Sequence, residues 1–454
     1  MPSTPQASGL LTDLYELTMA AGYLETGFDA RATFELFVRS LPARRNYLVA
    51  AGLDQALDFL EGVRFSAEEI AYLRTLPVFQ AIGDNFFEYL AKFRFSGDVW
   101  AIPEGAVFFP GEPILRVTAP IIEAQVVETS LLAAINFQTM IASKAARVTQ
   151  AAAGKNVIEF GTRRAHGTEA GVLAARAAMI GGCLGTSNVA AGMQFGIHVY
   201  GTQAHSWIMA HEDEGEAFRK FLEVFPDQAV LLVDTYDVRA AVDKIIALGR
   251  KPRGIRLDSG DFAADSKWAR KRLDQSGWQS VIIFASGDLE EERIAQLLAE
   301  GAPIDGFGVG TALVNSIDSP SLGVIYKLVE IEYHGAVRSA AKFSTEKVTY
   351  PGRKQVYRFH RPGGQFESDI IGLEDEQFPN AEKLLQPVMT GGKRCVARTN
   401  LFEARERCRK QVSQLSERLR SLTTEPDSSP VSHSEKLENL LSDARRRLRA
   451  AART

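Results

Sequence analysis

The pattern of apolar and polar residues changes twice along this 454-residue chain. In the first part, apolar positions recur at helical spacing over residues 10–20 and 70–95, and they alternate like a strand over residues 32–38. Between residues 97 and 120, Gly and Pro residues separate short apolar runs, which is typical of a meander of strands. This first part therefore predicts an α+β domain that ends near Pro120.

From residue 123 to about residue 328 the pattern is different. A long helix is expected over residues 123–153, and short apolar runs then alternate with helical stretches. The expected strands are 157–160, 196–200, 229–233, 254–257, 281–285 and 306–309. The expected helices between them are 169–179, 214–224, 238–248, 264–274 and 290–298. Such alternation predicts parallel strands with crossover helices, and seven or eight units of this kind favour a closed barrel over an open sheet.

Beyond Lys342 the chain is more basic and richer in turns, which predicts short strands that return to the first domain. Residues 401–422 read as a charged amphipathic helix, residues 423–433 as a mobile Ser/Pro/Asp linker, and residues 435–451 as a basic helix. The basic helix could bind a partner, but a solvated surface helix is the simpler interpretation. No internal repeat is visible.

The predicted fold class is α/β: an irregular TIM-like barrel plus an N-terminal α+β domain that C-terminal segments complete. The expected divisions are an N-terminal domain (1–122), a barrel (123–341), a segment packing on the N-terminal domain (342–400) and a helical tail with its linker (401–454).

Composition narrows the function classes. Apolar residues make up 45% of the chain and charged residues 24%, which is ordinary for a globular protein. The formal net charge of -4 argues against a nucleic-acid surface, because such surfaces carry a basic excess. Three widely spaced cysteines form no metal pattern and indicate a reducing compartment. A polar N-terminus and the lack of a membrane-spanning apolar run lead us to expect a cytoplasmic protein with no membrane partner.

The most distinctive stretch is 201–207, Gly-Thr-Gln-Ala-His-Ser-Trp, which follows the expected strand 196–200. Its central residue, His205, lies between small residues that leave room for a substrate. Imidazole is well suited to nucleophilic or proton-transfer chemistry near neutral pH. A single histidine after an apolar strand is more often structural, so its context decides the interpretation.

That context is a series of polar turns. In a parallel barrel the active site lies at the C-terminal ends of the strands. Each expected strand is followed there by polar or glycine-rich residues, in the turns 161–167, 201–206, 234–237, 258–261, 286–288 and 308–311. One such turn would mean little, whereas six in succession indicate a site.

The last two turns, Ser286-Gly287-Asp288 and Gly308-Val309-Gly310-Thr311, offer small residues, backbone N–H groups and hydroxyls in front of helix N-termini. Barrels hold phosphate groups in this way. Carboxylates at Asp234, Asp258, Asp261 and Asp288 suit Mg²⁺ or ribose hydroxyls, although Asp261 and Asp288 could equally be helix caps. Arg163, Arg164 and Arg256 suit anions. The site therefore fits a phosphorylated, pyrophosphorylated sugar and a second anion.

Longer motifs add a family resemblance. From residue 10 to about residue 392 the chain resembles nicotinate phosphoribosyltransferases. The motifs that carry the resemblance are Leu11-Thr12-Asp13-Leu14-Tyr15, Glu159-Phe160-Gly161-Thr162-Arg163-Arg164, Gly201-Thr202-Gln203-Ala204-His205-Ser206, Arg256-Leu257-Asp258-Ser259-Gly260-Asp261, Gly308-Val309-Gly310-Thr311 and Pro351-Gly352-Arg353-Lys354-Gln355. The tail after Gly392 matches weakly, and no role is carried over to it.

The resemblance implies that nicotinate and phosphoribosyl pyrophosphate give nicotinate mononucleotide and pyrophosphate, with ATP as co-substrate and Mg²⁺ as cofactor. It implies an ATP-dependent ligase of NAD biosynthesis and a homodimer with shared active sites, in which the N-terminal segment reaches a site built largely by the partner. It also implies that ATP transiently phosphorylates His205.

The residue roles follow partly from the resemblance and partly from the chemistry of the side chains. The resemblance places Tyr15, Phe160, Thr202 and Arg256 at nicotinate and Thr311 at the phosphoribosyl phosphate. The full set of expected site residues is His205, Asp258 and Asp288 (catalytic), Tyr15, Phe160, Arg163, Thr202 and Arg256 (nicotinate), Asp261, Ser286, Gly287, Gly308, Gly310 and Thr311 (phosphoribosyl), with Asp258 and Asp288 as Mg²⁺ ligands.

Related transferases remain as alternatives. Nicotinamide phosphoribosyltransferases carry an aspartate where this chain has Ser187; a carboxylate there would accept a hydrogen bond from an amide but repel an acid. Its absence favours nicotinate. Quinolinate phosphoribosyltransferases are smaller and need more cations for a second carboxylate.

Two other classes also remain. An aldolase- or isomerase-type phosphate barrel would need a Schiff-base lysine or a general base on a strand, and no lysine lies at these strand ends. A non-catalytic phosphohistidine carrier would keep His205 but would have no use for Tyr15, Arg256 and Thr311 together.

Overall fold

The computed structural model describes residues 7–344, 347–423 and 429–451. The chain forms two compact units: unit 1 combines residues 1–139 with 321–454, and unit 2 comprises residues 140–320. The division falls within one long helix and before a strand of unit 1, whereas the sequence pattern suggested a barrel from 123 to 341.

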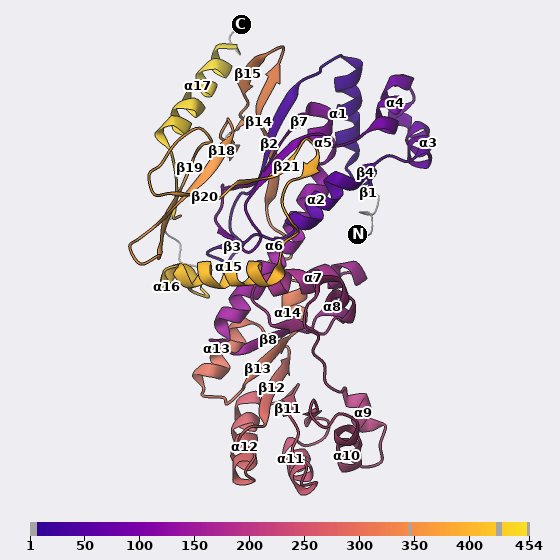
Figure 1. Ribbon diagram of the computed structural model, residues 1–454, viewed down its shortest axis with the longest axis vertical. Helices are drawn as coiled ribbons and strands as arrows, with labels where there is room; N and C mark the ends of the chain where they lie inside the picture. The colour runs from indigo at the N-terminus through magenta and orange to yellow at the C-terminus, as the bar shows by residue number, and fades with distance from the viewer. Residues whose placement is uncertain (1–6, 345–346, 424–428, 452–454) are drawn as a thin grey trace. The chain divides into compact units, whose positions relative to one another are not determined.

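Unit 1 is built on a seven-stranded antiparallel sheet (Figure 1). In spatial order its strands are β15 (Ala336–Ser339), β14 (Val324–Tyr333), β2 (Arg31–Val38), β7 (Pro113–Pro120), β5 (Asp98–Ala101), β21 (Gln386–Thr390) and β22 (Lys393–Arg394). Strand β7 is almost wholly buried, and the apolar alternation of β2 pairs with it at the centre of the sheet. Segments from both ends of the chain thus share one core.

The helices of unit 1 flank this sheet. They are α1 (Leu14–Glu25), α2 (Leu53–Gly62), α3 (Ala67–Thr75), α4 (Asp84–Lys92), α5 (Ile121–Val126) and the first part of α6 (Glu128–Ala151), with a short 3₁₀ turn at Pro77–Phe79. Two small ladders join β1 (Ala7–Ser8) to β4 (Val63–Arg64) and β3 (Leu48–Val49) to β6 (Val107–Phe108). The helix expected over 123–153 is present over Ile121–Ala151, divided into α5 and α6 at the single residue Val127, which keeps right-handed backbone angles (φ -90°, ψ -3°).

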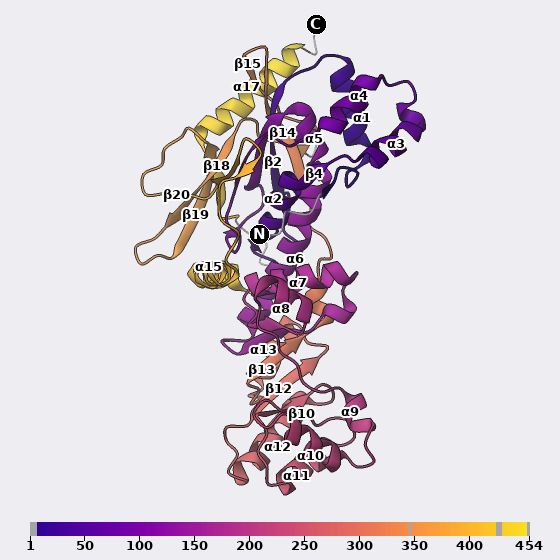
Figure 2. The same cartoon turned by 45° about the vertical axis from the view of Figure 1, so that its right-hand side comes forward.

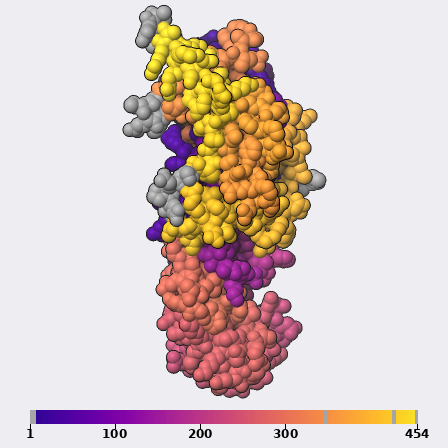
Figure 3. Space-filling view, turned by 90° about the vertical axis from the view of Figure 1, so that its left-hand side faces the viewer, coloured from indigo at the N-terminus to yellow at the C-terminus, as the bar shows by residue number. Residues whose placement is uncertain are grey.

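The C-terminal segment adds a second sheet to unit 1. Its order is β20 (Glu382–Lys383), β18 (Lys354–His360), β19 (Phe366–Leu373) and β23 (Val431–His433), and a small ladder joins β16 (Phe343–Ser344) to β17 (Lys347–Val348). The tail continues as α15 (Leu401–Gln414), α16 (Glu417–Arg420) and α17 (Glu435–Ala451). Figure 3 shows this tail, in yellow, lying against the orange strands.

The tail differs from its sequence prediction. The expected linker 423–433 contains strand β23, which pairs in parallel with β19, while residues 424–428 lie outside the described residues. Helix α17 is also more than a solvated surface helix, because Leu437, Leu441 and Ala444 are buried. A strand of three residues is too short to be predicted from the sequence pattern when its pairing partner lies 62 positions away.

Unit 2 contains a six-stranded parallel sheet with crossover helices (Figure 2). The strands, in spatial order, are β10 (Val230–Leu232), β11 (Gly254–Leu257), β12 (Ile282–Gly287), β13 (Gly306–Val309), β8 (Asn156–Glu159) and β9 (Gly185–Thr186). The helices are the end of α6, α7 (Thr168–Ile180), α8 (Val189–Phe195), α9 (His205–Met209), α10 (Glu214–Val224), α11 (Val238–Ala247), α12 (Phe262–Gln275), α13 (Glu291–Ala299) and α14 (Thr311–Val314), with a 3₁₀ turn at Thr162–Arg164.

The sheet winds back on itself, since the first strand, β8, lies between the last strand, β13, and β9. A single parallel bridge from Thr186 to Val199 extends it further. In the described chain no ladder joins Val199 to β10, so the α/β fold is as predicted but a closed barrel is not confirmed. The expected strand 196–200 was wrong: Gly196 ends α8 in the left-handed region (φ 68°), and only Val199 forms a bridge.

By length and composition alone, Ile121–Ala151 is apolar enough to cross a membrane. However, 56% of its most apolar window is buried inside the protein, as in a core helix.

Candidate active site

A cavity of about 620 Å³ lies in unit 2, where the chain leaves the C-terminal ends of β8, β11, β12 and β13. Parallel strands carry the turns that follow them to one edge of the sheet, which is why these residues meet. The expected site residues that line the cavity are Phe160, Arg163, Thr202, His205, Arg256, Asp258, Ser286, Gly287, Asp288, Gly308, Gly310 and Thr311. The imidazole and the glycine-rich turns therefore face the same space.

His205 is the first residue of α9 and follows an irregular loop instead of a strand. Its Nδ1 lies 3.2 Å from the Thr235 hydroxyl and its Nε2 lies 3.6 Å from Asp258 Oδ2. The side chain is 40% exposed. Two polar neighbours therefore orient the ring, while enough of its surface remains open for a reactant.

Asp258 is held by the turns on either side of it. Its Oδ1 accepts a hydrogen bond from the Ser286 hydroxyl. Asp234 Oδ2 accepts hydrogen bonds from the Asp258 backbone N–H (3.2 Å) and from the Ser259 hydroxyl (2.6 Å). The other oxygen, Asp234 Oδ1, is buried without a hydrogen-bond partner. The turns after β10, β11 and β12 are thus tied together through carboxylates.

Arg256 brings a half-buried cation into this cavity. One Nη donates to the Gln203 carbonyl at 3.1 Å, and Nε is buried with no hydrogen-bond partner. Within the described chain no carboxylate lies within 4.0 Å of the guanidinium. Burial lowers the pKa of Arg256, although the Asp258 and Asp234 charges act in the opposite direction. A desolvated guanidinium without an ion-pair partner is a ready receptor for an anion.

The glycines of the late turns are required by close packing. Gly287 has φ 117°, and a Cβ there would lie 2.4 Å from the Asp258 carbonyl oxygen. A Cβ on Gly308 would lie 2.6 Å from the Phe160 ring. The backbone can therefore approach both the Asp258 turn and the Phe160 ring only because these positions lack side chains.

Behind the first turn lies a buried carboxyl group, Glu159. It accepts hydrogen bonds from the Thr186 hydroxyl (2.6 Å) and the Gly161 backbone N–H. Burial raises the pKa of Glu159, and these two donors partly offset that rise. Glu159 therefore fixes the turn that carries Phe160 and Arg163.

Sequence reasoning gave no role to several residues that the structure brings to the site. Gln203 supplies the carbonyl for Arg256, and Thr235 contacts His205. The other lining residues without a predicted role are Thr162, Gly201 and Ala204; Arg164, expected to bind an anion, and Ser187, expected to distinguish nicotinate from nicotinamide, line the cavity too. Their nearness to the predicted motifs along the chain is the signal that could have included them.

Two expected residues are not among those that line the cavity. Asp261 caps α12 by accepting hydrogen bonds from the Ala263 and Ala264 backbone N–H groups at 3.1 and 3.0 Å. Tyr15 belongs to unit 1, in the first turn of α1, with 46% of its surface exposed. Burial raises the pKa of Tyr15, and so does the negative charge of Glu128. The Glu128 carboxylate also accepts a hydrogen bond from the Tyr15 hydroxyl, which raises this pKa further.

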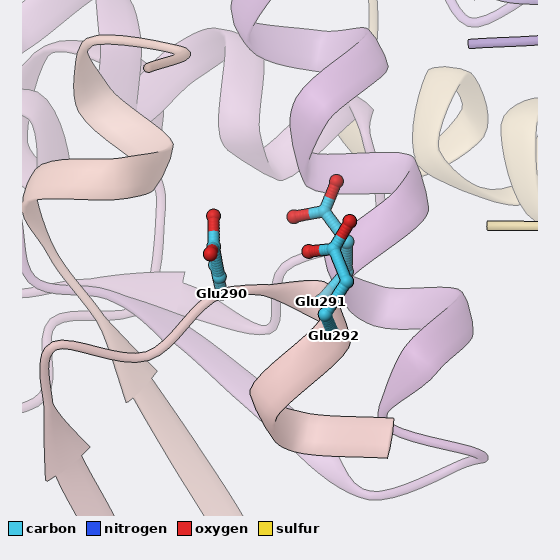
Figure 4. A group of neighbouring side chains, drawn as sticks. All are labelled: Glu290, Glu291 and Glu292. Atoms are coloured by element: carbon cyan, nitrogen blue, oxygen red, sulfur yellow. The ribbon is translucent and has the colours of Figure 1, made fainter. Parts of the chain in front are cut away.

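Carboxylates suited to Mg²⁺ are present in two places. Asp258 and Asp288 line the cavity, and neither forms an ion pair with a lysine or arginine in the described chain. Two such carboxylates, completed by water and substrate phosphates, fit the usual Mg²⁺ site. A separate trio, Glu290, Glu291 and Glu292, lies at the start of α13 (Figure 4), but the buried Lys144 ammonium already pairs with two of them, Glu290 and Glu291.

Comparison with known proteins agrees with this geometry. Three family models match the chain: the nicotinate phosphoribosyltransferase N-terminal domain over residues 10–136, the family core over residues 156–360 and the C-terminal domain over residues 377–441. The chain belongs to the nicotinate phosphoribosyltransferase family. The match through residue 441 corrects the expectation that the resemblance fades after Gly392.

Individual relatives show how far the family likeness extends. The nicotinate phosphoribosyltransferase pncB2 of Mycobacterium tuberculosis (strain CDC 1551 / Oshkosh) is 47% identical over 94% of this chain and 92% of its own length. The nicotinate phosphoribosyltransferase of Bacillus subtilis (strain 168) is 44% identical over 84% of this chain and 80% of its own length. The crystal structure of human nicotinic acid phosphoribosyltransferase superposes with a TM-score of 0.83 at 28% identity, covering 95% of this chain and 99% of that chain.

Proposed function

We propose that the protein transfers the phosphoribosyl group of phosphoribosyl pyrophosphate to nicotinate, giving nicotinate mononucleotide and pyrophosphate. The C1–O bond to pyrophosphate breaks, and the pyridine nitrogen forms a new bond to C1. One observation carries this proposal: the unpaired guanidinium of Arg256 faces the same cavity as the glycine-rich turns and His205. A carboxylate and a phosphorylated sugar are the ligands that such a cavity would bring together.

The nicotinate end is assigned to Arg256, Arg163, Thr202 and Phe160. Arg256 would bind the carboxylate of the nicotinate ring, because the attraction between the two charges would offset the desolvation energy of the buried, unpaired guanidinium. The Phe160 ring lines the cavity and would stack on the pyridine, which leaves the ring nitrogen free to attack. Ser187 also lines the cavity, so the side chain there does not repel an acid. Tyr15 would complete the pocket from a partner subunit.

The phosphoribosyl end is assigned to Ser286, Gly287, Gly308, Gly310 and Thr311. Their backbone N–H groups and hydroxyls suit a phosphate dianion in front of the helices that begin beyond these turns. Asp258 and Asp288 would hold Mg²⁺, which when bound would offset charge on the departing pyrophosphate. Asp261 would act on ribose only indirectly, through the turn that it caps.

ATP coupling is assigned to His205. The γ-phosphoryl group of ATP would pass to an imidazole nitrogen as ADP leaves, and water would later release phosphate. The ring is oriented by Thr235 and Asp258 and remains partly exposed, which supports this step. The added negative charge would then order the surrounding loops before transfer. On this proposal the protein is an ATP-dependent ligase of NAD biosynthesis.

A cytoplasmic homodimer with shared sites completes the proposal. A second cavity, of about 310 Å³, lies in unit 1 and is lined by Arg39, Lys327, Lys342, Lys354 and His433 and by no carboxylate. Arg39, Lys327 and Lys342 suit phosphate groups, whereas Lys354 is buried and paired with Glu35 at 2.7 Å, and burial lowers the pKa of His433.

The deciding experiment measures pyrophosphate release from phosphoribosyl pyrophosphate with nicotinate, nicotinamide or quinolinate, each with and without ATP. We expect pyrophosphate release with nicotinate but not with nicotinamide or quinolinate, and we expect ATP to increase the rate of that release. Pyrophosphate release with nicotinamide or quinolinate, or no release with any of the three acceptors, would refute the assignment. The oligomer is checked by mixing Tyr15→Ala and His205→Ala proteins, because shared sites predict ATP-stimulated transfer in the mixture at a rate that neither variant reaches alone.

A further inference from the structure

The two phosphate turns proposed above lead into buried carboxylates. Two and three residues beyond Asp288, at the start of α13, lie Glu290 and Glu291, and the Glu291 side chain is 1% exposed. Beyond the short helix α14 stands Asp318, whose side chain is 8% exposed. Each turn that lines the cavity is therefore continuous with a carboxylate that the core encloses.

One lysine contacts both carboxylates. Lys144, on α6, is 1% exposed, and its Nζ lies 2.6 Å from Glu291 Oε2, 3.1 Å from Asp318 Oδ1 and 3.8 Å from Glu290 Oε2. One turn further along the helix, Arg147 Nε donates to Glu291 Oε1 at 2.9 Å. Helix α6 thus contacts both the segment after β12 and the segment after β13 through one ammonium group, that of Lys144.

This arrangement argues against a metal site in the glutamate trio of Figure 4. The ammonium group already occupies the space beside Glu291. Burial raises the pKa of Glu291, but the charge and hydrogen bond of Lys144, a backbone N–H and the Arg147 charge together outweigh burial and hold the pKa below its ordinary value. The carboxylate therefore remains ionised as the partner of a lysine.

Stability alone does not account for such a cluster. Burying several charges costs desolvation energy, and apolar residues of similar volume commonly give equal or greater stability. A single cation in contact with carboxylates of two segments fixes the distance between those segments, which an apolar contact does less well. The segments fixed here are the ones that carry Gly287 and Gly310.

We propose that Lys144 is a positioning residue for the phosphoribosyl phosphate, holding the β12–α13 and β13–α14 turns at the separation that a phosphate requires. This inference rests on the proposed function of the same cavity. Lys144 does not line the cavity and acts only through the turns it binds.

The test compares Lys144→Met and Lys144→Arg with a matched control, Lys244→Met. Lys244, on α11, also pairs with two carboxylates of unit 2, Glu214 at 3.3 Å and Asp213 at 3.6 Å, at the start of α10, but its side chain is 41% exposed, so it controls for the loss of a paired lysine away from the phosphate turns. Calorimetric binding of ribose 5-phosphate and the KM values for both substrates are measured on the full-length protein, with thermal unfolding as the folding check.

Lys144→Met is expected to weaken ribose 5-phosphate binding and raise the KM for phosphoribosyl pyrophosphate roughly 10- to 100-fold, the scale of a misplacement of about 1 Å. The KM for nicotinate should stay within about twofold, Lys144→Arg should recover part of the loss, and the control should match wild type. A folded Lys144→Met protein with unchanged phosphate binding, or with both KM values raised equally, would overturn the inference.

If Lys144→Met does not fold, Asp318→Ala decides, because it removes the Lys144 contact to the segment that follows β13 and α14 and leaves the Lys144–Glu291 pair. Weaker ribose 5-phosphate binding supports the clamp, and unchanged binding overturns it. Failure of the proposed function has a different result: the wild-type protein itself would then release no pyrophosphate and bind no ribose 5-phosphate.

Discussion

Replacing Arg256 tests both the substrate and the energetics of the cavity. The guanidinium is half-buried, keeps one hydrogen bond to the Gln203 carbonyl, and meets no carboxylate within 4.0 Å in the described chain. In Arg256→Ala the nicotinate carboxylate would enter the cavity without its cation. Losing one partner of a desolvated pair costs roughly 2–4 kcal/mol. At about 1.4 kcal/mol per tenfold, nicotinate binding should weaken roughly 30- to 700-fold.

The assay is calorimetric titration of nicotinate and, separately, of phosphoribosyl pyrophosphate. Arg164→Ala is the matched control, because Arg164 lines the same cavity but is exposed to solvent. The Arg256 variant should lose nicotinate affinity far more than phosphoribosyl pyrophosphate affinity, whereas the control should lose little of either. An equal loss for both ligands would assign Arg256 to the phosphates and refute the reasoning.

The same residue predicts a gain in stability. An unpaired cation in a partly buried site costs desolvation energy in the free protein, and burial lowers the pKa of Arg256 accordingly. Arg256→Met should therefore raise the free energy of unfolding by roughly 0.5–2 kcal/mol while it weakens nicotinate binding as Arg256→Ala does. Chemical denaturation measures this, and a destabilised variant would show that the guanidinium is better compensated than its contacts indicate.

Three further variants test other parts of the structure. His205→Ala should abolish the ATP stimulation and the acid-labile label from γ-labelled ATP but leave slow transfer, because ring and sugar contacts persist; unchanged coupling would refute the phosphohistidine. Gly287→Ala should lower the free energy of unfolding by about 1–3 kcal/mol, because its Cβ would lie 2.4 Å from the Asp258 carbonyl oxygen at φ 117°; a neutral effect in denaturation would contradict that packing. Burial raises the pKa of Glu16 from 4.5 to about 7. Between those values the native state keeps a proton that the unfolded state has released, so stability falls as pH rises. Glu16→Gln should remove this pH dependence, which amounts to a change of up to about 3 kcal/mol in the free energy of unfolding. Denaturation at several pH values measures it, and the same pH dependence in both proteins would refute the assignment to Glu16.

Much of unit 2 was predictable from its sequence. Residues 254–257 and 306–309 are short apolar runs bounded by glycine and polar residues, and they form β11 and β13 within the predicted limits. The gathering of polar residues at one edge also followed from the sequence, because parallel strands place all their C-terminal turns together.

Other features depend on contacts that a sequence pattern does not carry. Residues 196–200 look like a strand, yet the left-handed Gly196 and a single bridge at Val199 leave them irregular. Strand β23 exists only because β19 offers an edge to it. Lys144 is one lysine in a long helix, and nothing in its neighbours along the chain reveals the three carboxylates that surround it.

The division of the chain also has a consequence for biosynthesis. Unit 1 is interrupted by all of unit 2, and its strand β2 pairs with β14, which begins at residue 324. On the ribosome, residues 140–320 emerge as one uninterrupted stretch and can fold while the N-terminal half of the other sheet still waits for its neighbour. A chain that ended near residue 320 would leave the edge of β2 unpaired, and unpaired strand edges promote aggregation. Only the segment after residue 320, which contains β14, covers this edge.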